Sequence, residues 1–377
     1  MKKTKLLSLV LSVALMLSLF SACGTQNATD TGTTTATATG SSTATTSSDT
    51  SGATVSDEVA NFKPVTWKLA HIRPEGSRTD ETAKWFADEI NKQTDGKITI
   101  EIYPARSLGD YEVVQERISM GDVEMALQGA GQSIDKSLIL PTLPYLFSSW
   151  DEVIKYTDMD TGIVAQFVKE RLANQDITLL GQYPMYFACI ASSKEIPDYT
   201  NATASRNLKA RVPTSTAFDL LGTTFGFIST PLPSSENFTS MQTGIVDAVI
   251  GGGAEYYWGE LKDVVNYLLP CKTHFETQWL MISSETFDSL PTEFQDIITT
   301  LSAELQSKGF EQAQAEEQTF FDDFTANGAT VYELTDEQVQ GYATVYRENC
   351  WPQLESDLGD EGLAVLNQIR DDLGITY

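Results

Sequence analysis

Three consecutive glycines separate an apolar run from one acid and three aromatic residues in the stretch DAVIGGGAEYYW, residues 247–258. A glycine-rich turn can bind phosphate when its backbone N–H groups are followed by Lys-Ser or Lys-Thr. Neither pair follows here, and Glu255 would repel an anion at the start of the next helix. The stretch therefore predicts a tight turn or a ligand pocket in which the glycines leave space.

The residues that most often carry catalysis or hold metals are scarce. The two histidines are His71 and His274, and no G-x-S-x-G or H-E-x-x-H pattern occurs. The cysteines beyond the N-terminal segment match no zinc or redox spacing, and they are Cys189, Cys271 and Cys350. We expect no metal site, no cofactor, at most one disulfide and buried free thiols. A glycosidase with a carboxylate pair stays an alternative, although no pair stands out among the 52 acids.

Length and charge narrow the class of protein. The chain has 377 residues, enough for about two domains. Its formal net charge of −27 would repel nucleic acid and anionic membranes, so we expect no nucleic-acid partner. A periplasmic or secreted ligand-binding protein is compatible with this charge.

The N-terminal segment has the features of an export signal. A basic start precedes an apolar run over residues 6–20, which is shorter than the roughly 20 residues of a membrane span. The run ends in LFSAC, which resembles the lipobox of bacterial lipoproteins. We therefore expect a signal peptide over residues 1–22 and lipidation of Cys23. The alternative is an ordinary signal peptide that is cleaved at about the same place and leaves a free thiol.

Residues 23–58 consist mainly of Thr, Ser, Ala and Gly. Such a segment cannot bury a core and is expected to be a disordered tether. A lipidated cysteine with a tether predicts a protein anchored to the outer face of a bacterial membrane, with the periplasm as the alternative.

Strands and helices alternate along the rest of the chain, which predicts an α/β fold with parallel strands. Apolar residues alternate over 65–69 and again over 98–102, and helical spacing lies between them. Further strands are expected over DITLLGQY, YFACIAS, KARVP, GFISTPLP, IVDAVIG and WLMIS. From Pro291 the chain is mainly helical, with a long helix that either breaks at Gly309 or continues through it.

The order of several segments resembles the solute-binding proteins of TRAP transporters. These segments are WKLAHIRPEGSRTDETAKWFADEINKQTDGKITIEIYPARSLGD, LPYLFSS, NLKARVPTSTAFDLLG, SSENFTSMQTGIVDA and SSETFDSLPTEFQDII. The ordered set runs from about Trp67 to the C-terminus.

The resemblance implies a two-lobed, periplasmic-binding-protein-like α/β fold (type II-like). A ligand cleft lies between the lobes, and a long C-terminal helix braces both. By analogy, one lobe holds residues 60–185 and 277–316, and the other holds 186–276 and 317–377. The family captures small organic acids outside the cell and delivers them to a separate membrane permease without catalysis. We expect a monomer whose partners are a carboxylate ligand, the permease and, through the lipid, the membrane.

The resemblance places the family's ligand-contacting arginine at Arg211. A planar guanidinium binds a carboxylate bidentately and stays charged when it loses water. The segment KARVP ends at a proline before a helix, which places Arg211 at a strand end, where open α/β sheets bind ligands. The alternative is an arginine on the surface or between strands.

Three positions depart from the family pattern. Ala188 stands where many members carry a second arginine, Gly251 where they often carry asparagine, and Ser234 where an aromatic residue is common. With small residues at these positions, Gly251, Gly252 and Gly253 would leave room beside Arg211 and expose their backbone N–H groups. They favour a ligand that is larger than the usual small dicarboxylate or different in shape.

Further candidates follow strand ends or lie near the glycines. Arg73 could replace the missing arginine, and Glu75 could accept a hydrogen bond from a hydroxyl or amine. The other polar candidates are Arg78, Gln128 and Gln132. The aromatic candidates, for each of which a core position is the alternative, are Tyr256, Tyr257, Trp258 and Trp279. An extracellular ligand-sensing lipoprotein of the same fold is the second functional hypothesis, and a secreted hydrolase is the third.

Overall fold

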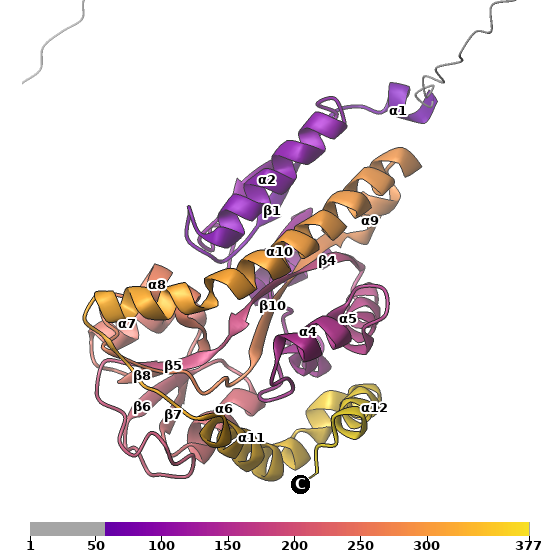
Figure 1. Ribbon diagram of the computed structural model, residues 1–377. Coiled ribbons are helices and arrows are strands. Elements are labelled where there is room, and N and C mark those ends of the chain that lie inside the picture. The colour runs from indigo at the N-terminus through magenta and orange to yellow at the C-terminus, as the bar shows by residue number, and fades with distance from the viewer. Residues whose placement is uncertain (1–56, 377) are drawn as a thin grey trace, which may run out of the picture. The chain divides into compact units, whose positions relative to one another are not determined.

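The computed structural model describes residues 57–376, so the predicted signal peptide, Cys23 and nearly all of the tether lie outside it. Within this range the strands form a five-stranded and a six-stranded sheet, with helices packed against both (Figure 1). None of the helices described has both the length and the apolar composition of a membrane span.

The first sheet has the strand order β2-β1-β3-β10-β4. Its strands are β1 (Val65–Ala70), β2 (Ile98–Tyr103), β3 (Met125–Gln128), β4 (Ile177–Phe187) and β10 (Phe275–Ser283). The predicted parallel pairing is confirmed for β1 with β2 and β3, whereas β10 runs antiparallel to β3 and β4. The helices of this part are α1 (Asp57–Asn61), α2 (Arg78–Gln93), α3 (Tyr111–Ser119), η1 (Lys136–Thr142), α4 (Trp150–Thr157), α5 (Ile163–Ala173) and α9 (Ser284–Asp288).

The second sheet has the strand order β11-β9-β5-β8-β6-β7. Its strands are β5 (Cys189–Ser192), β6 (Lys209–Val212), β7 (Ile228–Pro231), β8 (Ala248–Gly252), β9 (Tyr267–Leu269) and β11 (Thr330–Val331). The neighbouring helices are α6 (Thr216–Thr224), η2 (Ser234–Glu236), α7 (Asn237–Gln242) and α8 (Ala254–Leu261). Strands β7, β6 and β8 are parallel, so their carboxyl ends lie along one edge.

The chain crosses between the sheets at Ala188, which separates β4 from β5, and returns between β9 and β10. The sequence predicts two strands that are interrupted near Pro184. Instead, β4 continues through this proline, because the pairing with β10 shifts register next to it, where Tyr186 faces Glu276 and Pro184 faces Thr277. The bulge accommodates a residue that cannot donate a ladder hydrogen bond.

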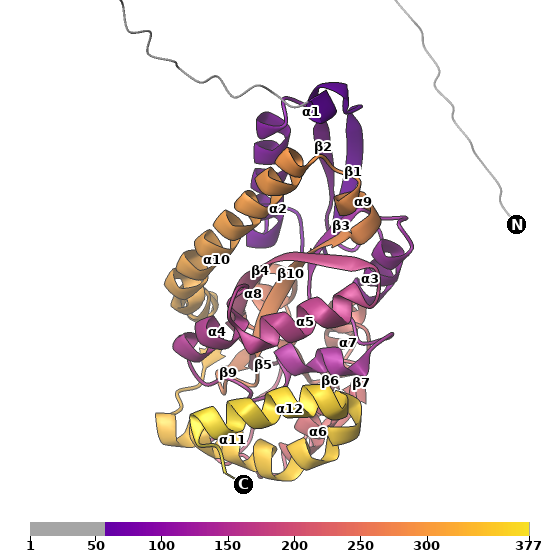
Figure 2. The same cartoon turned by 90° about the vertical axis from the view of Figure 1, so that its right-hand side faces the viewer.

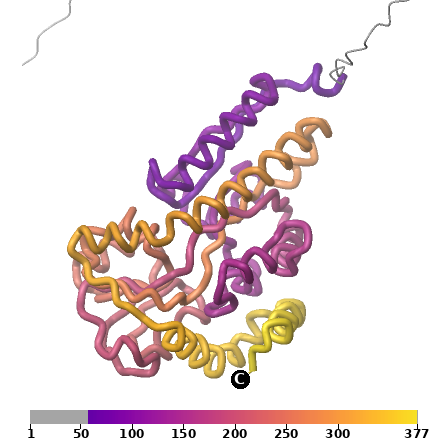
Figure 3. Tube along the Cα trace, in the orientation of Figure 1, coloured from indigo at the N-terminus to yellow at the C-terminus, as the bar shows by residue number. Residues whose placement is uncertain are grey.

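A single helix, α10 (Thr292–Ala326), braces both sheets, as predicted. It packs on β4 and α2 beside the first sheet and on α8 and β11 beside the second. The helix continues through Gly309, and Figure 3 shows its unbroken trace. A Cβ at Gly309 would lie 2.7 Å from the Tyr183 ring, so the glycine permits close packing on β4.

The C-terminal helices are α11 (Asp336–Cys350), η3 (Trp351–Gln353) and α12 (Glu355–Leu373). Helix α11 packs on α6, whereas α12 packs on η1 and α5 (Figure 2). Helix α12 belongs to the residues predicted for the second lobe, but apart from the adjacent η3 it packs on elements from the residues predicted for the first. The lobe boundaries therefore stay a prediction.

The three cysteines of the described chain are buried and free, as predicted. Burial raises the pKa of the Cys271 thiol to about 12, which keeps this side chain protonated at neutral pH.

Candidate functional site

A cavity of about 90 Å³ lies at the carboxyl ends of parallel strands from both sheets. Open α/β sheets bind ligands at such edges. The lining residues lie at or after the ends of β1, β2, β3, β6, β7 and β8, or at the return into β10. They are Ile72, Arg73, Tyr111, Gly129, Ala130, Gln132, Thr142, Arg211, Pro213, Phe218, Ser234, Gly251, Tyr256, His274 and Glu276.

Arg211 lines this cavity from the end of β6 and is 4% exposed. Its Nε donates a hydrogen bond to the Leu232 carbonyl (2.9 Å), and its Nη1 donates to the Ile250 carbonyl (3.5 Å). No carboxylate in residues 57–376 forms an ion pair with Arg211. Burial lowers its pKa, but an arginine stays charged in a protein. The site thus holds a buried cation that only neutral groups contact, an arrangement that costs free energy unless an anion binds.

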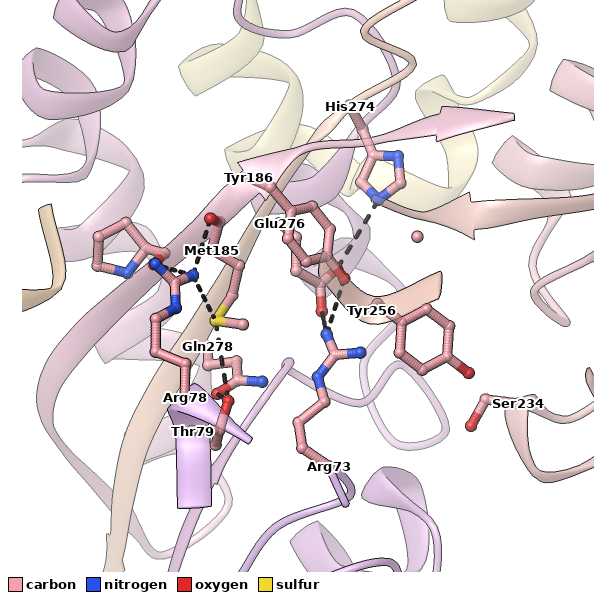
Figure 4. A network of polar contacts seen from close by, with 12 residues as sticks. Arg73, Arg78, Thr79, Met185, Tyr186, Ser234, Tyr256, His274, Glu276 and Gln278 are labelled. Atoms are coloured by element: carbon pink, nitrogen blue, oxygen red, sulfur yellow. Dashed lines mark hydrogen bonds and ion pairs between the residues drawn. The ribbon is translucent and has the colours of Figure 1, made fainter. Parts of the chain in front are cut away.

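Arg73 also lines the cavity, but the protein already supplies its partners. Its Nη2 donates to the Tyr186 hydroxyl (2.8 Å) and to Glu276 Oε1 (3.3 Å), as Figure 4 shows. The guanidinium carbon lies 4.5 Å from the ring centroid of Tyr256, within the range of a cation–π interaction. Burial acts to lower the pKa of Arg73, but Tyr186, Glu255 and Glu276 outweigh this effect and raise it.

Glu276 and His274 enter the cavity where the chain returns to the first sheet. Glu276 Oε2 lies 3.7 Å from His274 Nε2, and the other ring nitrogen, Nδ1, is 3.1 Å from Thr273 Oγ1. These residues were not predicted as site residues, because the sequence pattern predicts a strand over WLMIS only. An acid in a strand that is otherwise buried would have been the signal. Tyr111 and Phe218 were missed too, because nothing in their local sequence separates them from core aromatics.

Ser234 lines the cavity and joins the second sheet to the loop after β2. Arg106 donates to Ser234 Oγ from Nε (3.3 Å) and Nη2 (3.2 Å), and the serine donates to Asp110 (3.2 Å to Oδ2). Arg106 Nη1 also donates to Glu260 (3.1 Å) in α8. These contacts connect the two sides of the cavity.

The prediction that Gly251 leaves room beside Arg211 is wrong. Gly251 lines the cavity and has φ +107°, a conformation that L-residues rarely adopt. A Cβ there would lie 2.6 Å from Pro213 Cγ, so the proline ring occupies the space that a side chain would need.

Aromatic rings fill the space beside the next two glycines. A Cβ on Gly252 would lie 2.4 Å from Tyr256 Cδ1, and one on Gly253 would lie 2.3 Å from Tyr186 Cδ2. Gly252 is not among the residues that line the cavity, and its N–H donates to the Tyr257 hydroxyl (3.0 Å). The glycines therefore permit close packing of rings, with Gly253 preceding the first residue of α8.

Several predicted site residues lie away from the cavity. Glu75 has a side chain that is 79% exposed beside Lys84, because the turn at Gly76 and the start of α2 direct it outward. Gln128 and Trp279 are fully buried and face each other across β3 and β10. Gln128 Nε2 donates to the Tyr111 carbonyl (2.7 Å), so this glutamine supports a lining residue.

The remaining candidates divide between the cavity and the core. Gln132 and Tyr256 line the cavity. Arg78 donates to the Met185 carbonyl, Tyr257 is buried, Trp258 packs on Phe324, and Ala188 lies at the sheet crossing. In the described part of the chain, no group of three or more His, Cys, Asp or Glu side chains is arranged to hold a metal ion.

Comparison with known proteins identifies the family of this chain. The family described as bacterial extracellular solute-binding protein, family 7, matches residues 69–350. The ectoine-binding periplasmic protein TeaA of Halomonas elongata is 25% identical over 319 residues, which cover 81% of this chain and 89% of TeaA.

Two solved structures have the same fold. A TRAP periplasmic solute-binding protein from Rhodoferax ferrireducens with bound malonate has a TM-score of 0.72 at 23% identity, and the match covers 82% of this chain and 100% of that one. One from Haemophilus influenzae with bound L-gulonate has a TM-score of 0.72 at 21% identity, covering 81% and 99%. The predicted two-lobed fold and the resemblance to TRAP solute-binding proteins are confirmed. Members of this family are extracytoplasmic binding proteins rather than enzymes, and the chain belongs to the bacterial extracellular solute-binding proteins, family 7.

Proposed function

We propose that this protein captures a small organic acid in the cavity through Arg211 and delivers it to the membrane permease of a TRAP-type transporter. The observation that carries the proposal is the burial of Arg211 beside the cavity with carbonyl partners only. Relatives and structural neighbours named for ectoine, malonate and L-gulonate support an acid as the ligand.

The guanidinium supplies both the affinity and the orientation of the ligand. Carbonyl groups accept two of the five N–H groups of Arg211, and the others remain for a carboxylate. A charge-assisted hydrogen bond contributes roughly 1.5–3 kcal/mol, so a bidentate pair in this cavity contributes enough to select acids over neutral solutes. Closure around the acid requires that the closed form bind it more tightly than the open form.

Placement at the membrane is part of the proposal. The basic start, the apolar run and LFSAC support export and lipidation of Cys23, and the tether would then hold a monomeric binding body at the outer face of the membrane. Cys23→Ser should release the protein from the membrane fraction. Retention of this variant at wild-type level would contradict the lipid anchor.

Calorimetry with a panel of mono- and dicarboxylates, sugar acids and neutral analogues tests the binding step. Arg211→Ala should abolish binding of every acid that the wild type binds. Arg211→Lys should weaken it more than about 100-fold, because the two-pronged geometry is lost. Arg347→Lys is the matched control, since Arg347 is also buried and donates to a carbonyl, that of Tyr145, away from the cavity.

The control variant should lose stability and keep its affinity for the acid. Unchanged affinity in both Arg211 variants would refute the proposal. Delivery is tested separately, by uptake of the same acid in cells with and without the permease. Uptake that does not depend on the permease would favour the sensor hypothesis.

A further inference from the structure

We infer that the ligand carries a single carboxylate, held by Arg211, and that its opposite end donates a hydrogen bond to Glu276. This inference rests on the proposed function and specifies its substrate class. It excludes dicarboxylates as the preferred ligands, although the cavity contains two arginines.

Pairing inside the cavity leaves one positive charge for the ligand. The charged lining residues are Arg73, Arg211 and Glu276. Glu276 neutralises Arg73 at 3.3 Å, whereas Arg211 contacts only carbonyl oxygens. One carboxylate would balance the unpaired charge of Arg211. A second carboxylate would meet a cation that is already paired, and it would lie near the negative charge of Glu276.

Glu276 retains the capacity to accept a hydrogen bond. Its Oε1 accepts from Arg73, while Oε2 lies 3.7 Å from His274 Nε2, beyond hydrogen-bond distance. The side chain is 18% exposed and lines the cavity. An ionised carboxylate only accepts hydrogen bonds, so a ligand must offer it a hydroxyl, amide or amine group.

Tyr111 lines the cavity together with Arg211 and Glu276. The rest of the wall is mixed, with apolar or aromatic side chains from Ile72, Ala130, Pro213, Phe218 and Tyr256 and polar side chains from Gln132, Thr142 and Ser234. The ligand is therefore an acid that carries a hydrogen-bond donor at the end opposite its carboxylate.

Matched acids that differ only at the far end test this inference. Succinate, succinamate and monomethyl succinate have the same four-carbon backbone with a carboxylate at one end. At the other end, succinate has a second carboxylate, succinamate has an amide that donates hydrogen bonds, and monomethyl succinate has an ester that does not. The malonate and glutarate series, and the pair gluconate and glucarate, extend the test to other lengths. Dissociation constants are measured by calorimetry on the full mature chain at pH 7.

We expect succinamate to bind at least 10-fold more tightly than succinate, with monomethyl succinate between the two. Gluconate should likewise bind at least 10-fold more tightly than glucarate. A diacid that binds as tightly as its monoamide would overturn the single-carboxylate assignment while leaving the proposed function intact. An ester that binds as tightly as the amide would overturn the hydrogen bond to Glu276. If no acid binds, the proposed function itself fails, and the inference fails with it.

Glu276→Gln provides a second test, because it removes the charge and keeps the shape. It leaves Arg73 without its anionic partner, so the diacid should gain at least 10-fold relative to the monoamide. Glu260→Gln is the matched control, since Glu260 is also partly buried and paired with an arginine, Arg106, but does not line the cavity. This control should keep the wild-type preference. An unchanged preference in Glu276→Gln would contradict the inference.

Discussion

Gly251→Ala tests how the backbone of β8 shapes the cavity. The residue has φ +107°, where an L-residue costs about 1–3 kcal/mol. The new Cβ would also lie 2.6 Å from Pro213 Cγ, and relieving such an overlap in a packed region costs about 1–3 kcal/mol. We expect the free energy of unfolding, measured in urea, to fall by about 2–6 kcal/mol.

Gly328→Ala separates the two contributions. Gly328 has φ +94°, but a Cβ there would meet nothing within 4 Å, so only the backbone cost applies. Gly251→Ala should therefore destabilise the protein by about 1–3 kcal/mol more than Gly328→Ala does. Introducing Pro213→Ala should remove most of this excess, which a double-mutant cycle measures directly.

Gly251→Ala should also weaken ligand binding. A Cβ on Gly251 would lie 3.6 Å from Arg211 Nη1, so relaxation away from Pro213 presses on the guanidinium. Calorimetry with the acid that binds the wild type most tightly should show a higher dissociation constant, whereas Gly328→Ala should leave it unchanged. If Gly251→Ala costs no more stability than Gly328→Ala and binds the acid normally, the space beside Gly251 is not filled by the proline.

The remaining predictions concern a cap, a buried histidine and a contact across the cavity. Thr335→Ala removes the capping box of α11 and should lower the free energy of unfolding by about 1 kcal/mol in urea without changing acid affinity. Burial lowers the pKa of His71 below 6.5, so the folded state binds fewer protons than the unfolded state, and stability should fall as the pH drops below 6.5. Urea unfolding at pH 7.5 and 5.5 should show a smaller loss in His71→Gln, and an equal loss would contradict the assignment. Arg106→Ala should weaken acid binding about 10-fold, because it removes the contacts with Ser234 and with α8. Arg117→Ala, which breaks an ion pair away from the cavity, should bind normally in the same calorimetric assay.

Local periodicity was sufficient to predict most of the fold. Apolar residues alternate over 65–69 and 98–102, with helical spacing between them, and this pattern predicts that the two strands pair in parallel. The prediction succeeds because a strand–helix–strand unit forms from contacts within a short length of chain. The position of β10 between β3 and β4 was not predictable in this way, because the strand comes from far along the chain. The extension of β4 through Pro184 depends on a bulge against β10, which the local sequence does not show.

The candidate site was predictable only where a side chain follows a strand end. Arg211 and Gln132 reach the cavity for that reason, whereas Glu75 also follows a strand but points to solvent. A sequence shows that a glycine lacks a side chain, but it does not show which neighbour fills the space. At Gly251 that neighbour is Pro213.

Pairing, rather than composition, determines what the cavity can bind. Ala188 stands where the family resemblance predicts a second arginine, and the sequence suggested that Arg73 compensates for its absence. Arg73 does reach the cavity, but Glu276 and Tyr186 occupy its guanidinium. The chain therefore presents two arginines to the cavity with the net effect of one positive charge. In a protein with a formal net charge of −27, we propose that this local positive charge attracts an anion to the cavity, and a single positive charge favours a single carboxylate.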